Sequence, residues 1–258
     1  MSAPRGKDEV SGDPRHGKLA SGDRGCVLVL AGLDPSGGAG LLADAEALRA
    51  FGLRPLCVAT ALTVQTTRHA LQFQPVAPLL VQDSARALLE EEPIRAIKIG
   101  MVGAEQVARA ILDLLQDFRA LPLVVDPVLF ASSGAPLFKG PGGVAAYLEL
   151  MRGAIVTPNL AEAEALSGTR EQEAAARALV SQGARAALVK GGHLDGDAID
   201  LLYDGERVER LAGARIAVGR RGTGCRFASA LAAGLASGRP LLEAAQGAKA
   251  FVRGYLLG

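Results

Sequence analysis

The stretch with the clearest chemical signature is RRGTGCRFASALAAGLASG, which begins at Arg220. Gly222, Thr223 and Gly224 lead into an Ala-rich segment with the composition of a long helix. The first amides of such a helix bind anions, and phosphoryl transfer depends mainly on positioning and on stabilising the charge in flight. Cys225 lies at the helix start, where thiol pKa values fall from about 8.5 to about 7 or lower. We expect it to accept a proton or align an acceptor oxygen, whereas an isolated cysteine is otherwise inert filler.

Polar residues follow two apolar runs at the points where each run ends. Asp126 lies in VVDPV, Thr157 and Asn159 lie in VTPN, and Glu162 comes one helical turn later. Carboxylate and amide oxygens of this kind suit Mg²⁺, held mostly through water. The alternative is local: Asn159 as a helix N-cap and Glu162 as a first-turn charge.

A lysine ends a third apolar run. Lys190 closes AALVK and is followed by Gly191. A cation at that position can meet phosphate groups. His193 lies just beyond, and we assign it no catalytic role because a lone histidine is more often a local hydrogen-bonding residue.

The segment AGLDPSGGAGLLAD follows the first apolar run and opens a helical pattern. It is neither a Walker A loop nor a G-x-G-x-x-G motif, but its glycines, Gly32 among them, let the backbone approach a ligand closely. Asp44 falls one helical turn after Gly40 and is expected to face the same cavity. The alternative is a tight turn followed by a solvated helix aspartate.

Gln65 lies in the β-prone run TALTVQTT. Its primary amide carries a donor beside an acceptor, which complements the edge of an aminopyrimidine. An exposed strand glutamine is the alternative reading.

These candidate residues lie between the predicted strands and helices of an α/β protein. The runs CVLVLA, PLCVAT, AIKIG, LPLVVD, GAIVTP and AALVKGG have the apolar character of buried parallel strands. Helical spacing recurs at 107–118 and 171–182, and residues 199–211 read as a hairpin turning at Asp204-Gly205. Strands alternating with helices predict a mainly parallel sheet covered on both faces, with ligands at the carboxyl ends of the strands.

Composition excludes several other classes. The 258 residues carry 28 Lys+Arg against 27 Asp+Glu, so no general basic field is available for nucleic acid or a membrane. No apolar run approaches the ~20 residues that span a bilayer, and the three cysteines form no disulfide framework or zinc spacing. We expect a cytoplasmic protein with a disordered extension at 1–24 and one domain at 25–258.

Taken in order, AGLDPSGGAGLLAD, TALTVQTT, KIGM, VVDPV, TPNLAEAEAL, VKGGH and GTGC resemble the hydroxymethylpyrimidine/phosphomethylpyrimidine kinases of thiamine biosynthesis, in the ribokinase-like superfamily. The resemblance implies a three-layer α/β/α sandwich, a homodimer, a pyrimidine substrate under a small flap, and ATP with Mg²⁺. It implies ATP-dependent phosphorylation of 4-amino-5-hydroxymethyl-2-methylpyrimidine and then of its monophosphate.

The resemblance also assigns roles by position. The pyrimidine site would comprise Gly32, Asp44, Gln65, Met101 and Val128. The transfer centre would comprise Lys190, Gly222, Gly224 and Cys225. The nucleotide would contact Thr157, Asn159, Lys190, Gly191, Arg221 and Thr223, and the metal site would comprise Asp126, Asn159 and Glu162.

Among its departures from the family pattern, the chain differs in the residues just before Gly-Thr-Gly-Cys. The family usually has Asn-x-His before Gly-Thr-Gly-Cys, whereas this chain has Gly219, Arg220 and Arg221. We expect Arg221 to replace the histidine as a phosphate ligand, since a guanidinium grips phosphate oxygens bidentately. The alternative is a solvated loop arginine.

Two other functions stay open. Related pyridoxal/pyridoxine kinases share the Gly-Thr-Gly-Cys site, although Gln65 favours an aminopyrimidine. A catalytically weak pseudo-kinase that binds the pyrimidine as a sensor is the second alternative.

Overall fold

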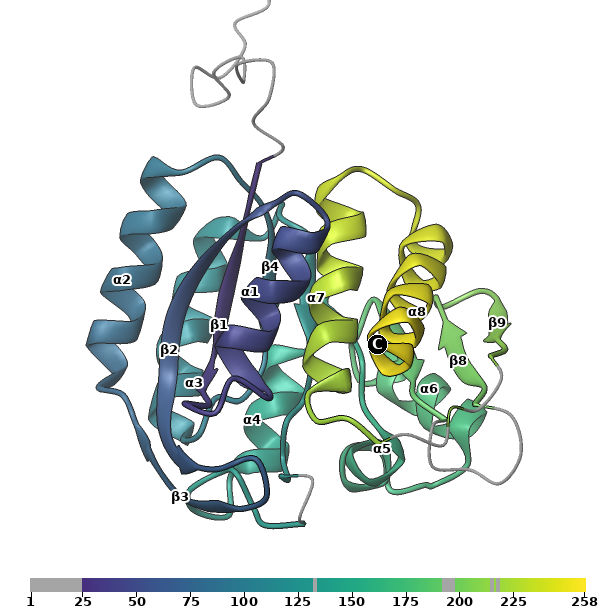
Figure 1. Ribbon diagram of the computed structural model, residues 1–258, viewed down its shortest axis with the longest axis horizontal. Coiled ribbons are helices and arrows are strands. Elements are labelled where there is room, and N and C mark those ends of the chain that lie inside the picture. The colour runs from purple at the N-terminus through teal and green to yellow at the C-terminus, as the bar shows by residue number, and fades with distance from the viewer. Residues whose placement is uncertain (1–24, 132–133, 192–197, 214–215, 217–218) are drawn as a thin grey trace, which may run out of the picture.

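A nine-stranded sheet forms the centre of the computed structural model, which describes residues 25–131, 134–191, 198–213, 216 and 219–258 (Figure 1). The strand order is β3-β2-β1-β4-β5-β6-β7-β8-β9. The strands are β1 (Cys26–Leu33), β2 (Arg54–Gln65), β3 (Ala70–Pro75), β4 (Ile94–Ile99), β5 (Leu123–Val125), β6 (Ile155–Val156), β7 (Ala186–Val189), β8 (Asp200–Tyr203) and β9 (Val208–Leu211). Pairing is parallel from β2 through β7, and antiparallel where β3, β8 and β9 join.

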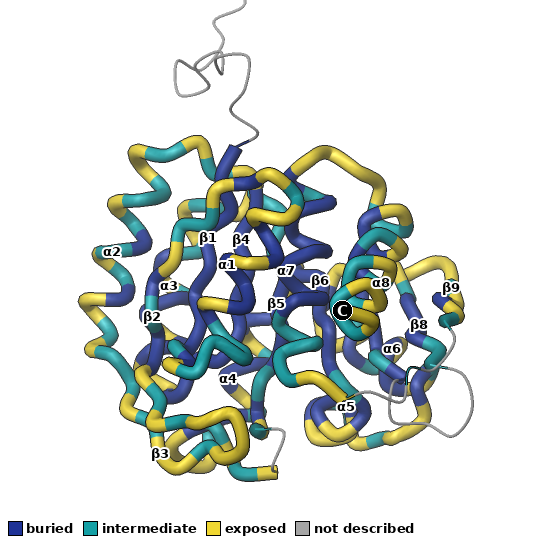
Figure 2. Tube along the Cα trace, viewed as in Figure 1, coloured by how far each residue is buried: buried dark blue, intermediate teal, exposed yellow. Residues whose placement is uncertain are grey.

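Helices cover both faces of this sheet. The helices are α1 (Gly40–Ala50), α2 (Pro78–Glu91), α3 (Glu105–Leu115), the 3₁₀ turn η1 (Gln116–Phe118), α4 (Gly143–Leu150), α5 (Leu160–Ser167), α6 (Gln172–Ser181), α7 (Thr223–Ala236) and α8 (Leu241–Leu257). One apolar cluster joins the sheet to α2 through α6, and the other joins it to α1, α7 and α8. β1 and β4 through β8 are largely buried, whereas β3, much of β2 and the outer sides of the helices are more exposed (Figure 2).

The order in which strands are added to the sheet reverses between β1 and β4. The first connection runs from β1 to β2 on one side, and the later one places β4 on the other side of β1. The carboxyl ends of neighbouring strands at such a switch point leave a crevice, which is where open α/β sheets bind their ligands.

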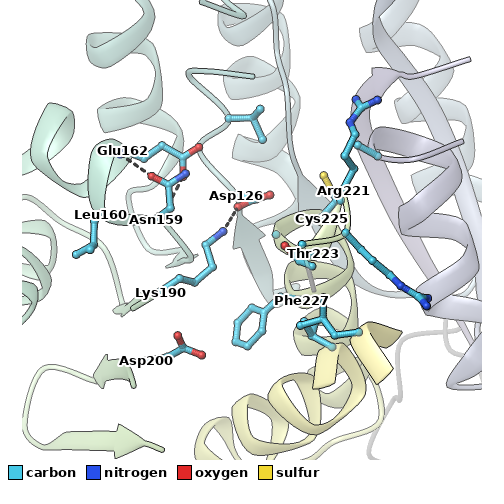
Figure 3. Close-up of a pocket in the computed structure, with 18 of the residues that line it drawn as sticks. Asp126, Asn159, Leu160, Glu162, Lys190, Asp200, Arg221, Thr223, Cys225 and Phe227 are labelled. Carbon is cyan, nitrogen blue, oxygen red and sulfur yellow. Dashed lines mark hydrogen bonds and ion pairs between the residues drawn. The ribbon is translucent and has the colours of Figure 1, made fainter. Parts of the chain in front are cut away.

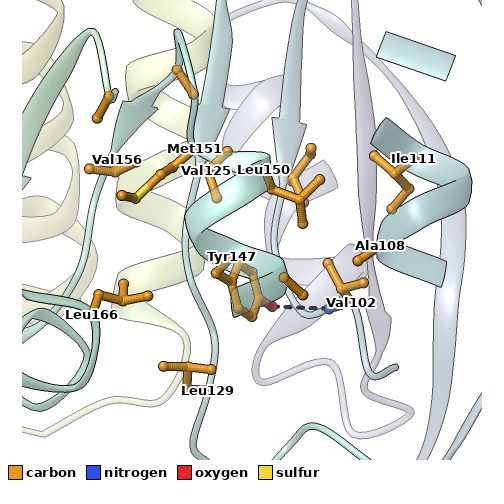
Figure 4. Packing of buried hydrophobic residues seen from close by; sticks show 14 of the residues in the cluster. Val102, Ala108, Ile111, Val125, Leu129, Tyr147, Leu150, Met151, Val156 and Leu166 are labelled. Atoms are coloured by element: carbon orange, nitrogen blue, oxygen red, sulfur yellow. Dashed lines mark hydrogen bonds between the residues drawn. The ribbon is translucent and has the colours of Figure 1, made fainter. Parts of the chain in front are cut away.

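The core also fixes the loop that leaves β4. The Tyr147 hydroxyl of α4 donates to the carbonyl of Gly100 at 2.9 Å and accepts from the amide of Val102 at 3.1 Å (Figure 4). Both backbone groups flank Met101. A fully buried tyrosine therefore holds the backbone of one predicted pyrimidine-site residue.

The predicted three-layer fold and its mainly parallel sheet are confirmed. The six apolar runs became β1, β2 and β4 through β7, and the 199–211 hairpin formed as β8 and β9. The β2–β3 hairpin was missed as an element, because the polar alternation in β3 is short. The extension predicted at 1–24 lies outside the described residues. In the part of the chain that the structure describes, every helix is too short or too polar to cross a membrane.

Candidate active site

A cavity of about 1320 Å³ opens at the carboxyl edge of the sheet. The residues around it come from the β1–α1 turn, the end of β2, the loops after β4 through β7, and helices α7 and α8. The predicted site residues that line it are Gly32, Gln65, Met101, Asp126, Val128, Asn159, Glu162, Lys190, Arg221, Gly222, Thr223, Gly224 and Cys225. Figure 3 shows Lys190 reaching from the end of β7 to Asp126 after β5, with Cys225 at the nearby start of α7.

The N-terminus of α7 forms one wall. Gly222 caps the helix with φ of 72°, a left-handed conformation that favours glycine. A Cβ atom there would lie 2.1 Å from the carbonyl oxygen of Gly38, so only glycine lets this loop meet the Gly-rich turn. The first amides of α7 have no carbonyl partner within the helix and carry its positive dipole end.

Lys190 places a cation beside this helix start. Its Nζ atom lies 2.9 Å from Oδ1 of Asp126, and 3.1 Å from the position that a Cβ atom would take at Gly224. Burial lowers the pKa of Lys190, but the carboxylates of Asp126 and Glu162 more than offset this effect, so the net shift is upward and the lysine stays charged. An ammonium group and a helix N-terminus therefore face the same volume.

Asn159 and Glu162 form a capping box at the start of α5. The Asn159 Oδ1 atom accepts from the Glu162 amide at 3.0 Å, and the Glu162 carboxylate accepts from the Asn159 amide at 2.9 Å. The local role considered for both residues is thus present, although both also line the cavity. Burial raises the pKa of Glu162 to about 7, and the nearby charge of Asp126 adds to the effect.

The oxygen donors here fit a hydrated divalent cation only in part. Within the described ranges, no three acidic, histidine or cysteine side chains are gathered closely enough to hold a metal ion by themselves. The carboxylates of Asp126 and Glu162 are the hard oxygen type that Mg²⁺ prefers, and Mg²⁺ commonly takes one or two carboxylates with waters and phosphate oxygens. The Asn159 oxygen is already engaged in the cap.

The thiol of Cys225 differs from the expectation. Burial raises its pKa to about 11, and the ammonium of Lys98 offsets only part of that shift. The prediction of a lowered pKa was wrong, because desolvation of the thiolate and the nearby carboxylates of Asp44 and Asp126 raise the pKa more than Lys98 lowers it. Cys225 is therefore a neutral thiol at pH 7, suited to align an acceptor oxygen by a hydrogen bond.

Asp44 lies behind the cavity wall instead of in it. Its carboxylate is fully buried, and both oxygens lie 2.9 Å from Nζ of Lys98, while Ser229 of α7 donates to Oδ1 at 2.8 Å. The expected direct contact with the pyrimidine is therefore corrected: Asp44 holds Lys98, which does line the cavity.

Two predicted nucleotide contacts also lie beneath the surface. Thr157 is fully buried and its hydroxyl donates to Asp126 at 3.3 Å. Gly191 donates its amide to Asp200 at 2.9 Å, and a Cβ atom there would lie 1.9 Å from the carbonyl oxygen of Ile199. Neither residue lines the cavity. The Thr157 hydroxyl and the Gly191 amide are hydrogen-bonded to carboxylates of the protein itself.

Gln65 and Arg221 lie on the acceptor side of the cavity. Among the described residues, none hydrogen-bonds the Gln65 amide, which leaves its donor and acceptor available. The Arg221 guanidinium contacts the carboxylate of Asp34 at 3.3 Å and donates to the carbonyl of Thr66. Its guanidinium is therefore paired and is not a solvated loop arginine. It also lies apart from Lys190, the residue beside which phosphate groups are expected (Figure 3).

Sequence reasoning missed three charged residues of the site. Lys98 interrupts an apolar strand, which was a usable signal. Asp34 organises the Gly-rich turn by accepting from Ser36 and Ala39. Asp200 carried no signal, because it lies inside the predicted hairpin and its partner Lys249 is 49 residues away; it also accepts from the amide of Gly191.

Comparison with known proteins gives one consistent family. The profile of the family described as phosphomethylpyrimidine kinase matches residues 34–257. The hydroxymethylpyrimidine/phosphomethylpyrimidine kinase of Rhizobium meliloti (strain 1021) is 42% identical over 236 residues, covering 88% of each chain.

Solved structures of two kinds of kinase share the fold. The phosphomethylpyrimidine kinase of Clostridium difficile 630 superposes with a TM-score of 0.78 at 31% identity, covering 89% of this chain and 98% of that one. The pyridoxal kinase of Staphylococcus aureus in complex with pyridoxal gives 0.82 at 31% identity, covering 91% and 88%. The fold alone therefore does not separate the two activities.

Proposed function

The chain belongs to the phosphomethylpyrimidine kinase family, and on this premise we propose that it phosphorylates 4-amino-5-hydroxymethyl-2-methylpyrimidine with ATP, and then phosphorylates the monophosphate, in thiamine biosynthesis. The observation that carries the proposal is the start of α7, where Lys190 and Cys225 meet at one cavity whose other wall holds Gln65. The free amide of Gln65 complements an aminopyrimidine edge.

In the first step the hydroxymethyl oxygen attacks the γ-phosphorus of ATP, the bond to the β-phosphate oxygen breaks, and ADP leaves. The amides of Thr223, Gly224 and Cys225 and the ammonium of Lys190 stabilise the charge on the transferring group. In a loose transition state the alcohol proton is lost late and passes to the transferred phosphate or to water, so a neutral Cys225 thiol that positions the acceptor oxygen is sufficient. In the second step the acceptor is an ionised phosphate with a second pKa of about 6, and no proton must be removed.

We propose that Mg²⁺ accompanies ATP. Asp126 and Glu162 are the residues that would hold it, largely through water, with Asn159 completing the surroundings. When bound, the ion neutralises charge on the phosphate groups. Glu162 supports this assignment, because a buried carboxylate whose pKa is raised to about 7 gains stability from a nearby cation.

A homodimer and a cytoplasmic location are part of the same proposal. Leu62, Val64 and Leu71 on the β2–β3 hairpin expose about half or more of their surface, and such apolar clusters mark association surfaces. A reaction that consumes ATP points to the cytoplasm.

The acceptor is tested by initial rates of ADP formation with the pyrimidine, its monophosphate and pyridoxal. Pyridoxal is included because the pyridoxal kinase structures share the fold. We expect kcat/KM for the pyrimidine to exceed that for pyridoxal at least about tenfold, because an acceptor without the matching edge leaves Gln65 unpaired. A higher kcat/KM for pyridoxal contradicts the proposal, and binding of the pyrimidine without ADP formation supports the sensor.

A further inference from the structure

Arg221 lies where three segments of the acceptor side meet. Its guanidinium bridges Asp34 in the β1–α1 turn and the carbonyl of Thr66 at the end of β2. Its backbone carbonyl accepts from the Tyr255 hydroxyl of α8 at 3.2 Å and from Arg226 of α7 at 3.4 Å. The residue is thus fixed at its backbone and extends its charged end to two further elements.

The Asp34 end of this bridge is a rigid anchor. The carboxylate is 2% exposed and accepts from the amide and hydroxyl of Ser36, at 2.9 and 2.7 Å, and from the amide of Ala39 at 3.1 Å. These bonds hold the carboxylate in one position. An arginine paired with it is held more firmly than one paired with a mobile surface carboxylate.

The Thr66 end belongs to a hairpin tip with few other restraints. Within the tip, the Thr66 amide donates to His69, and the amides of Arg68 and His69 donate to the Thr66 hydroxyl. Considering only the described residues, Arg221 is the one side chain from outside the hairpin that hydrogen-bonds residues 65–70. The carbonyl that it holds directly follows Gln65.

We propose that Arg221, in the loop that leads into α7, is a positioning residue that latches the tip of the β2–β3 hairpin to the β1–α1 turn, and so keeps Gln65 in place against the acceptor. The inference rests on the proposed function for the identity of the acceptor, but the latch itself is a property of the free protein. Arginine suits this role because its planar fork presents two donors to two acceptors at once, which the ammonium of lysine does not do with the same geometry. This role differs from that of a phosphate ligand, since both terminal nitrogens are engaged on the acceptor side.

Hydrogen exchange of the unliganded full chain tests the latch directly. In Arg221→Ala the amides of residues 65–70 should exchange about tenfold faster than in the wild type, because one charged hydrogen bond no longer opposes local opening. The matched control is Arg68→Ala, which removes an exposed arginine from the same tip, where its side chain contacts no described partner. Its exchange should match the wild type.

Ligand binding separates a latch from a phosphate ligand. In Arg221→Ala the Kd of the pyrimidine should rise about tenfold while that of ATP stays within about twofold, and Arg221→Lys should lie between the two proteins. Unchanged exchange at 65–70 overturns the proposal, and so does a weakened ATP affinity with an unchanged pyrimidine affinity. If the amides of β4 and β5 also exchange faster in Arg221→Ala, that variant is destabilised as a whole. The exchange of residues 65–70 in Arg221→Lys, judged in the same way, then tests the latch. If the wild type does not bind the pyrimidine, the proposed function fails, while the exchange data still decide on the latch.

Discussion

The Nζ atom of Lys98 lies 2.9 Å from both carboxylate oxygens of Asp44, and neither side chain is exposed to solvent. Burial raises the pKa of Asp44 and the lysine offsets only part of that shift, whereas the carboxylate outweighs burial for Lys98 and raises its pKa. The pair joins β4 to α1, and through Ser229 it reaches α7 one helical turn after Cys225. A buried ion pair therefore joins β4, α1 and α7 beneath the acceptor side of the cavity, which Lys98 lines.

Breaking this pair should destabilise the protein strongly. Lys98→Met leaves Asp44 buried without its cation, which costs about 3–5 kcal/mol in the free energy of unfolding by urea. The control is Arg109→Ala, which breaks an exposed ion pair with Glu105 and should leave the free energy of unfolding nearly unchanged, because exposed ion pairs contribute little. The double variant Lys98→Met/Asp44→Leu should recover most of the loss. Equal stability of Lys98→Met and the wild type would show that the pair is not formed.

The ionisation of Cys225 can be followed by alkylation with iodoacetamide. With a pKa of about 11, only about one thiol in ten thousand is ionised at pH 7, so the rate should rise about tenfold per pH unit from 7 to 9. The measurement uses a Cys57→Ser background, because Cys57 is exposed and Cys26 is fully buried. A plateau below pH 8 would restore the lowered pKa that the helix terminus predicts.

The role of Cys225 can also be tested by comparing kcat for the two phosphorylation steps in Cys225→Ser. Cys225→Ser keeps a hydrogen-bond donor at the helix start. If Cys225 positions the acceptor, kcat should fall by a similar factor with the alcohol and with the monophosphate. A much larger fall with the alcohol alone would show that the residue takes its proton.

Glu162 should make the free protein less stable as the pH rises. Its folded pKa is raised to about 7, from an ordinary value of about 4.5, so between these values the unfolded chain loses a proton that the folded protein keeps. Glu162→Gln preserves the cap acceptor and removes the titration. It should be more stable than the wild type at pH 8 by on the order of 1–3 kcal/mol, and nearly equal to it at pH 5, in urea unfolding without nucleotide or divalent cations.

The matched control for that titration is Glu164→Gln on the exposed side of α5, which should change little at either pH. A wild type that is as stable as Glu162→Gln at pH 8 would mean that Glu162 ionises without cost in the folded protein.

Gln65→Ala should weaken pyrimidine binding by about 1–3 kcal/mol, because the donor and acceptor of the pyrimidine edge lose their partner in the site. Calorimetric titration with the pyrimidine measures this change. Gln72→Ala removes an exposed glutamine from the same hairpin, opposite Val64, and should bind as the wild type does. Unchanged affinity in Gln65→Ala removes that residue from the site.

The sequence was most informative where a local rule and the tertiary structure agree. Buried parallel strands are continuous apolar runs that end in polar residues, so the sequence alone predicts that Asp126 and Lys190 lie at one edge of the sheet. The sequence also predicts the glycine-rich start of α7, because a left-handed backbone conformation such as that of Gly222 favours glycine locally.

The remainder depended on neighbours distant in the chain. Lys98 and Asp44 are 54 residues apart, and Arg221 and Thr66 are 155 apart, so no spacing rule relates them. For Cys225 a local rule existed and gave the wrong sign, because burial of the thiol raises its pKa and the local rule takes no account of burial. Burial of a single side chain is a tertiary property that one sequence does not display.

The most direct test of the central claim is a mass-spectrometric time course with the wild-type protein, ATP, Mg²⁺ and the hydroxymethyl aminopyrimidine, with pyridoxal in a parallel reaction. The pyrimidine monophosphate should appear first and then decline as the diphosphate accumulates, while pyridoxal remains largely unphosphorylated. Phosphorylation of pyridoxal with an unchanged pyrimidine, or no phosphorylated product in either reaction, would contradict it.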